Sequence, residues 1–271
     1  MPGFSRVSAA LRRLLHRALD RFDLPVLSGL NRGRRWRVGS GVLACWLGSY
    51  ETEEMAVFAA LARPGATVWD LGAHAGYFTL LASRRVGASG HVLAVEPHPV
   101  NLAALRHHLA LNGAGNVTVL ERAVCDVDGS EVAFSTDDAG HGYGGKVVPG
   151  DLKAGGSFRV RTATLDALIA AGERRPDLVK MDVEAMEAAV LEGAVDLLAS
   201  GRTVWMISMH LRDVAIRTID LLRASGLDIY SIDGSPVPFA TREKAVYPDI
   251  LWMLLAVPAG HPVPRVGLWK N

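Results

Sequence analysis

Hydrophobic residues follow two different periods along this chain, and the two periods alternate. Short apolar runs typical of buried strands occupy residues 68–71 and 92–96, and each is followed by a segment with helical spacing, at residues 77–86 and 99–111. A third strand is predicted at residues 117–125. Strands that alternate with helices predict a parallel sheet with helices on both faces.

The same alternation returns in the second half of the chain. The predicted elements are strands at residues 178–183, 204–209, 228–232 and 250–257, a helix from 184 to 198 and a helix from 212 to 225. The last two strands have no helix between them, which favours an antiparallel finish to the sheet. We therefore expect one α/β domain with a seven-stranded, mostly parallel sheet and a final antiparallel strand.

Between the two halves the pattern changes. Two short strands, residues 131–135 and 158–163, flank a segment at residues 140–156 that contains seven glycines. A long glycine-rich excursion inside a compact domain is either disordered or functional. We expect this segment to form a loop over the active site.

The N-terminal part is organised differently. Residues 8–22 have helical spacing with arginines on the polar face, and residues 32–40 are predicted to form a short hairpin. A helix at residues 50–62 opens with acids, which suit a helix N-terminus, and leads into the first strand. We expect a basic helical and hairpin segment at residues 1–49 and the main domain at residues 50–271.

Composition limits the size of the core and the class of protein. The chain has 271 residues, 49% of them hydrophobic, which is enough for one large core. Two cysteines, Cys45 and Cys125, make no disulfide framework, so a reducing compartment and a cytoplasmic location are expected. No apolar run approaches the roughly 20 residues of a membrane span.

Charge is spread unevenly. Residues 1–40 contain nine arginines and two aspartates, a net charge of +7, so the rest of the chain carries −6 of the total of +1. This asymmetry indicates an anionic partner, either a membrane surface or a protein, with a solvated helix face as the alternative. We expect residues 1–40 to be dispensable for cofactor binding, and we expect no nucleic acid partner.

The stretch at residues 67–79 carries the clearest chemical signal. A buried strand ends at Asp70, and Gly72 and Gly76 follow in a tight turn before a helix begins, so a ligand can approach the backbone. Glu96 ends the second strand, where an acid can bind the two hydroxyls of a ribose. The glycine spacing is not that of a dinucleotide fold, and Asp70 would repel a phosphate, so the pattern favours S-adenosylmethionine over NAD.

Ionisable residues follow most of the predicted strands. Because the carboxyl ends of parallel strands meet at one edge of a sheet, we expect these residues to gather around one ligand. They are Asp70, Glu96, Arg122 with Ala123, Asp182 with Glu184, and His210. Structural alternatives exist: Asp70 could cap a turn, Glu96 could be a helix-start acid, and His210 could be a core histidine. His107 and His108, in a predicted helix, are expected at the surface.

Three motifs resemble the FkbM family of class I methyltransferases. They are Asp-Leu-Gly-Ala-His-Ala-Gly-Tyr-Phe-Thr at 70–79, Ala-Val-Glu-Pro at 94–97, and Lys-Met-Asp-Val-Glu at 180–184 followed by Glu187. The resemblance covers about residues 50–257. It implies a Rossmann-like fold and transfer of a methyl group from S-adenosylmethionine to a hydroxyl oxygen of a sugar, a lipid or a secondary metabolite.

The chain departs from the family pattern at three places. His74 stands where the family usually has Asn, Ala185-Met186 where it usually has Gly-Ala, and Met209 where it often has an acid. The last two changes lie beside the expected acceptor pocket. They favour an alternative interpretation as a non-catalytic regulatory module that binds S-adenosylmethionine. An NAD-dependent oxidoreductase is a further alternative.

The resemblance and the strand ends together assign residues to roles. The expected cofactor-binding residues are Asp70, Gly72, Ala73, His74, Gly76, Tyr77, Glu96, Pro97, Asn101, Arg122, Ala123 and Asp182. The expected catalytic residues are Asp182, as first choice of base, His210, as second choice, and Glu184 and Lys180. Methyl transfer requires a positioned acceptor oxygen and a group that takes its proton. The expected acceptor is a hydroxylated small molecule or glycan, and no metal is expected.

Overall fold

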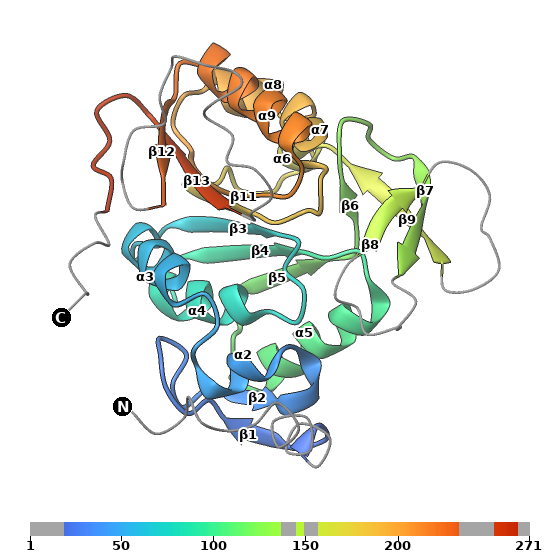
Figure 1. The fold of residues 1–271 in the computed structure, drawn as a ribbon, viewed down its shortest axis with the longest axis vertical. Coiled ribbons are helices and arrows are strands. Elements are labelled where there is room, and N and C mark those ends of the chain that lie inside the picture. The colour runs from blue at the N-terminus through green and yellow to red at the C-terminus, as the bar shows by residue number, and fades with distance from the viewer. Residues whose placement is uncertain (1–18, 137–144, 149–156, 233–251, 265–271) are drawn as a thin grey trace.

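The computed structural model of the chain describes residues 19–136, 145–148, 157–232 and 252–264. Its centre is a seven-stranded sheet in the order β12-β13-β11-β10-β3-β4-β5 (Figure 1). The strands are β3 (Thr67–Leu71), β4 (His91–Val95), β5 (Val117–Leu120), β10 (Leu178–Met181), β11 (Val204–Met209), β12 (Asp228–Ser231) and β13 (Trp252–Val257). The predicted seven-stranded α/β fold is confirmed.

Strand directions also follow the prediction. β11, β10, β3, β4 and β5 run parallel to one another, whereas β13 lies antiparallel between β11 and β12. From the central β3 the chain builds the sheet outward through β4 and β5, and later through β10 and β11 on the other side. This reversal of strand order lies between β3 and β10, and ligands of open α/β sheets bind at such a point.

Helices cover both faces of this sheet and define two cores. One face carries α3 (Thr52–Leu61), α4 (Tyr77–Val86) and α5 (Pro99–Leu111), and the other carries α6 (Leu165–Ala170), α7 (Glu187–Glu192), α8 (Val195–Ala199) and α9 (Arg212–Ala224) (Figure 1). Side chains of a strand alternate between the faces, so Val68 joins the first core and Trp69 the second.

A second sheet of four strands stands beside the main sheet. It has the order β6-β9-β7-β8 and consists of β6 (Ala123–Val124), β7 (Glu131–Thr136), β8 (Gly145–Val148) and β9 (Ser157–Ala163). The prediction of a single strand at 117–125 is therefore wrong. Residues 117–120 pair with β4 as β5, whereas residues 123–124 form a separate strand, β6, that pairs with β9. Within the glycine-rich segment, β8 pairs with β7, and the rest of 140–156 lies outside the described residues.

The helix predicted from Glu184 begins later, at Glu187. Glu184 and Ala185 have φ angles of +49° and +70°, a left-handed turn that a helix cannot continue through. The helix also ends at Gly193, and α8 starts anew at Val195. A Cβ at position 193 would lie 2.3 Å from the Cys125 carbonyl oxygen, so glycine permits this close approach.

The described part of the N-terminal segment packs against the main domain. Strand β1 (Asp23–Pro25) pairs with β2 (Arg35–Arg37). The prediction placed both strands of a hairpin within residues 32–40, but only one strand lies there, and its partner comes earlier in the chain. A 3-10 turn at Val38–Ser40 and the short helix α2 (Leu43–Leu47) follow. Val26, Trp36 and Cys45 lie in the same core as α3, α4 and α5. Most of the helix predicted at 8–22 lies outside the described residues.

Candidate active site

The loop between β3 and α4 turns sharply at the switch point of the sheet. Gly72 has φ +75°, and a Cβ there would lie 1.9 Å from the Asp182 carbonyl oxygen, so only glycine fits against β10. The N–H groups of Gly72 and Ala73 both donate to the Val95 carbonyl. Gly76, with φ +90°, precedes α4. The predicted tight turn is present, and it lies between the ends of β4 and β10.

Glu96, directly after β4, is buried and accepts three hydrogen bonds. Its carboxylate accepts from the His74 backbone N–H at 2.8 Å, the His98 backbone N–H at 2.9 Å and Asn101 Nδ2 at 3.2 Å. Burial raises the pKa of this carboxyl, and the two backbone donors oppose that shift. These contacts hold the carboxylate in one orientation at the edge of the cavity described below.

Asp70 and Lys180 are neighbours across β3 and β10. The two residues are register partners, and Lys180 Nζ lies 3.8 Å from Asp70 Oδ1. Asp70 is fully buried and also accepts a 2.6 Å hydrogen bond from Thr79 Oγ1 on α4. The ammonium of Lys180 further lies 4.9 Å from the centroid of the Phe78 ring. Asp70 thus ties β3 to α4 and β10 from inside the core.

Asp182, at the end of β10, lies between two cationic groups. Its Oδ2 accepts from Lys180 Nζ at 3.2 Å, and its Oδ1 lies 3.2 Å from His210 Nε2. These two partners hold the pKa of the Asp182 carboxyl well below its usual range, although burial acts in the opposite direction. Glu184 Oε2 lies 3.7 Å from the same histidine nitrogen. The carboxylate of Asp182 is therefore ionised and oriented.

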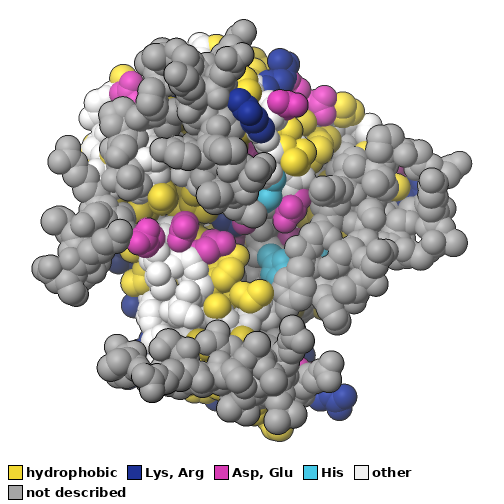
Figure 2. Space-filling view, in the orientation of Figure 1, with side chains coloured by type: hydrophobic (Ala, Val, Ile, Leu, Met, Phe, Trp, Pro, Cys, Tyr) yellow, Lys and Arg dark blue, Asp and Glu magenta, His cyan; other side chains and the backbone are white. Residues whose placement is uncertain are grey.

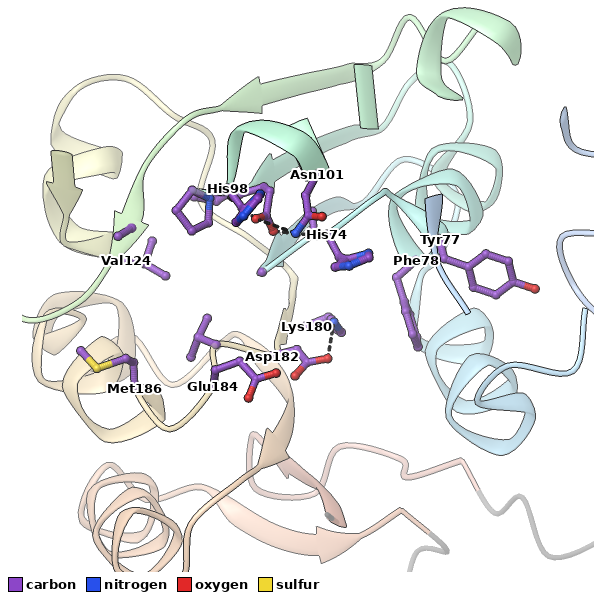
Figure 3. Close-up of a pocket in the computed structure, with 18 of the residues that line it drawn as sticks. His74, Tyr77, Phe78, His98, Asn101, Val124, Lys180, Asp182, Glu184 and Met186 are labelled. Carbon is purple, nitrogen blue, oxygen red and sulfur yellow. Dashed lines mark hydrogen bonds and ion pairs between the residues drawn. The ribbon is translucent and has the colours of Figure 1, made fainter. Parts of the chain in front are cut away.

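A cavity at the switch point brings most of these residues together (Figure 3). The predicted site residues that line it are Gly72, Ala73, His74, Tyr77, Glu96, Pro97, Asn101, Arg122, Ala123, Lys180, Asp182 and Glu184. Asp70, Gly76 and His210 do not line it. Figure 3 shows Lys180, Asp182 and Glu184 on one side of the cavity, opposite His74, His98 and Asn101.

Acidic and histidine side chains gather in the middle of the face shown in Figure 2. The part of the chain that the structure describes contains no group of three or more His, Cys, Asp or Glu residues suited to hold a metal ion. Nor does any helix in these described ranges have the length and hydropathy needed to cross a membrane.

Sequence reasoning missed one wall of the cavity, which comes from the N-terminal segment. Its residues there are Trp36, Gly41, Val42 and Cys45, and Tyr50 of the main domain also lines the cavity. The wall is held by α4 and α5: Asn31 Nδ2 donates to the Tyr77 carbonyl at 2.8 Å, and the Arg37 backbone N–H donates to His108 Nε2 at 3.0 Å. This packing counts against the expectation that residues 1–40 are dispensable for cofactor binding.

His108 differs from its prediction as a surface residue. It is fully buried in α5, and its Nδ1 lies 2.7 Å from the Ala75 carbonyl oxygen. Burial lowers the pKa of His108 to about 4, so this ring is neutral at pH 7. Other residues that line the cavity but were not among the predicted site residues are Phe78, Val95, His98, Val124, Val183 and Met186. Phe78, Val95 and Val183 lie within the three family motifs, and Met186 is one of the departures from the family pattern, whereas His98 and Val124 carry no distinctive sequence signal.

The chain is similar to known proteins in three comparisons. A family profile described as "Methyltransferase FkbM domain" matches residues 70–224, more than half of the chain. Among curated proteins, an arsenite methyltransferase of Halobacterium salinarum is 47% identical over 60 residues, which are 22% of this chain and only 15% of that protein.

Two solved structures illustrate the structural similarity. A methyltransferase FkbM from Methylobacillus flagellatus KT has 18% sequence identity and a TM-score of 0.47, with 76% of this chain and 51% of that chain covered. A putative O-methyltransferase from Klebsiella pneumoniae has 16% identity and a TM-score of 0.46, with 92% of this chain and 97% of that chain covered.

Proposed function

The chain belongs to the FkbM methyltransferase family, and from this premise we propose that it transfers a methyl group from S-adenosylmethionine to a hydroxyl oxygen of a sugar, a glycolipid or a secondary metabolite. The observation that carries the proposal is the carboxylate of Asp182, which lies in the same cavity as Gly72 and Glu96. Family membership rules out the alternative of an NAD-dependent oxidoreductase.

The cavity suits S-adenosylmethionine, which supplies an electrophilic methyl group on a positively charged sulfur. Glu96 presents a fixed carboxylate that can accept hydrogen bonds from two ribose hydroxyls. Gly72 lets the backbone come close to a ligand because it has no side chain. The lining holds three carboxylates, Glu96, Asp182 and Glu184, against the two cations Lys180 and Arg122, and this balance favours a cationic ligand.

Asp182 can take the proton of the acceptor hydroxyl in spite of its low pKa. A hydroxyl oxygen becomes strongly acidic once it begins to bond to a methyl group, so a weak base suffices at that stage. The carboxylate must then lie within hydrogen-bond reach of the acceptor, with the acceptor oxygen about 3–3.5 Å from the methyl carbon. Lys180 and His210 fix the plane of this carboxylate by binding one oxygen each.

His210 is poorly suited to be the base itself. Its two ring nitrogens lie against carboxylates, Nε2 against Asp182 and Nδ1 against Glu187 at 2.5 Å. Hydrogen bonds to these two acids raise the pKa of His210 to about 10 against the effect of burial, so the ring is already protonated at pH 7. This supports Asp182 as the first choice of base.

The test is a screen of hydroxylated glycans, lipids and polyketides with a methyl-labelled donor. Transfer of label to an oxygen of one acceptor class, lost in Asp182→Asn, is the expected result. Tight binding of the donor without transfer to any acceptor would favour the alternative of a non-catalytic regulatory module. Transfer to nitrogen, carbon or sulfur would contradict the oxygen specificity while leaving the methyltransferase activity intact.

A further inference from the structure

Glu187 is a buried acid that contacts His210 but does not itself take a proton in the mechanism above. It is the first residue of α7, its side chain is fully buried, and it does not line the cavity. Its Oε1 accepts the Ala185 backbone N–H at 3.1 Å and lies 2.5 Å from His210 Nδ1. A carboxylate removed from water is costly unless charged or polar partners bind it. Its contacts therefore point to a defined role at His210.

The geometry around His210 determines the charge of its ring. Among the described residues, the acids that face the imidazole are Asp182 and Glu184 at Nε2 and Glu187 at Nδ1. Carboxylate oxygens only accept hydrogen bonds, so both ring nitrogens must carry a proton to bind them. The ring is then an imidazolium held from two sides. Lys180, the other nearby cation, binds the far oxygen of Asp182.

The left-handed turn before α7 places the acids on both sides of the ring. Asp182 directly follows β10, Glu184 and Ala185 form the left-handed turn, and α7 then begins at Glu187. The Ala185 N–H, which this turn leaves outside the helix, donates to the Glu187 carboxylate. The Glu187 carboxylate thus binds both the backbone of the turn, at Ala185, and the ring of His210.

We propose that Glu187 is a positioning residue that keeps His210 protonated and oriented, so that the imidazolium fixes the carboxylate of Asp182 toward the acceptor. This proposal rests on the proposed function, because it assigns the acceptor proton to Asp182. The ionic chain runs from Glu187 through His210 to Asp182 and on to Lys180. Loss of the charge of Glu187 releases His210 from one side and leaves Asp182 with one firm partner.

The first test needs no acceptor. The full chain is labelled with ¹⁵N, and the imidazole nitrogen shifts are followed with pH in the wild type and in Glu187→Gln, which keeps the shape but not the charge. His210 signals are assigned by their absence in His210→Gln. Glu192→Gln, at the other end of α7 where the acid pairs with Arg217 near the surface, is the matched control.

We expect His210 to stay protonated above pH 9 in the wild type and in Glu192→Gln. In Glu187→Gln its pKa should fall by about one unit or more, since one of its opposite charges is gone. An unchanged titration of His210 in Glu187→Gln overturns the proposal. Because this measurement is made without methyl transfer, its result is independent of the proposed function.

The second test uses single-turnover transfer once an acceptor is known. Glu187→Gln should lower the rate by about 10- to 100-fold, as expected for a misplaced catalytic group. The loss should grow as pH rises through the lowered pKa of His210, and Glu187→Asp should restore part of the rate. Donor affinity, measured by calorimetry, should change less than about twofold. A loss that is equal at every pH, with no rescue, indicates a merely structural role and overturns the proposal.

His210→Gln is a second test variant, and it removes the positively charged imidazolium ring itself. It is expected to lower the transfer rate by a similar factor while the donor still binds. A wild-type rate in this variant overturns the proposal, even where Glu187→Gln does not fold.

Discussion

Trp36 stacks on His108, with ring centroids 3.9 Å apart and an angle of 18° between the planes. The indole also meets the edge of Tyr77 at 5.4 Å, and it is 1% exposed. This stack joins the strand β2 to the helix α5 and brings the N-terminal segment against the cavity. The segment is therefore part of the site as well as of the core.

We expect Trp36→Ala to lower the free energy of unfolding by about 3–5 kcal/mol, because a fully buried aromatic ring is removed. Urea unfolding followed by circular dichroism measures this loss. The affinity for S-adenosylmethionine should fall as well, since Trp36 lines the cavity. Phe22→Ala, at an exposed side chain of the same segment, is the control and should change stability by less than about 0.5 kcal/mol.

Glu96→Ala should weaken binding of S-adenosylmethionine by about 1.5–3 kcal/mol, because a charged hydrogen-bond partner of the ribose is lost. Isothermal titration calorimetry measures the affinity. Glu121→Ala removes an exposed acid that pairs with Arg106 near the same edge of the sheet, and it should bind like the wild type. Unchanged affinity in Glu96→Ala would remove the ribose assignment.

Asp182→Asn should lower turnover by about 10²–10⁴ while donor affinity changes little, because the shape remains but the proton acceptor is gone. Single-turnover methyl transfer measures the rate, and His210→Ala is compared with it. The smaller effect is expected for His210→Ala, since this histidine does not line the cavity. A dead His210→Ala beside a fully active Asp182→Asn would make the histidine the base.

Ala185→Gly should stabilise the protein by about 1 kcal/mol, because alanine at φ +70° is strained and glycine is not. Glycine also has the larger conformational entropy when unfolded, which limits the gain. Thermal or urea unfolding measures the difference. Ala188→Gly, inside α7, is the control and should lower the free energy of unfolding by about 1 kcal/mol. Equal destabilisation by both changes would show that the turn carries no strain.

The arginine-rich N-terminus should bind an anionic surface. We expect the full chain to sediment with vesicles that contain phosphatidylserine and to be released by salt, because residues 1–40 carry a net charge of +7. Replacement of Arg12, Arg13 and Arg17 by Glu should abolish binding, and it changes none of the residues that line the cavity. Vesicles of neutral lipid are the control. Equal binding of the substituted chain would exclude the membrane as the partner of these arginines.

The main sheet and the edge where the cavity lies could be predicted because both depend on short stretches of sequence. The alternation of apolar residues sets which face of a strand or helix is buried, and this pattern repeats within a few residues. Gly72 and Glu96 follow strands directly, so their place at the sheet edge needs only the parallel fold. The prediction of the cavity-lining residues around Gly72, Glu96 and Asp182 rested on this local information.

Only the tertiary structure decided which residues far apart in the sequence contact one another around the cavity. Trp36 meets His108 from 72 positions away, and His210 meets Glu187 from 23 positions away. Likewise, whether residues 123–124 extend β5 or pair with β9 depends on a partner strand far along the chain. Such contacts depend on how whole helices and strands pack against one another. The periodicity of the sequence predicts that a position is buried, but it does not predict which distant residue packs against it.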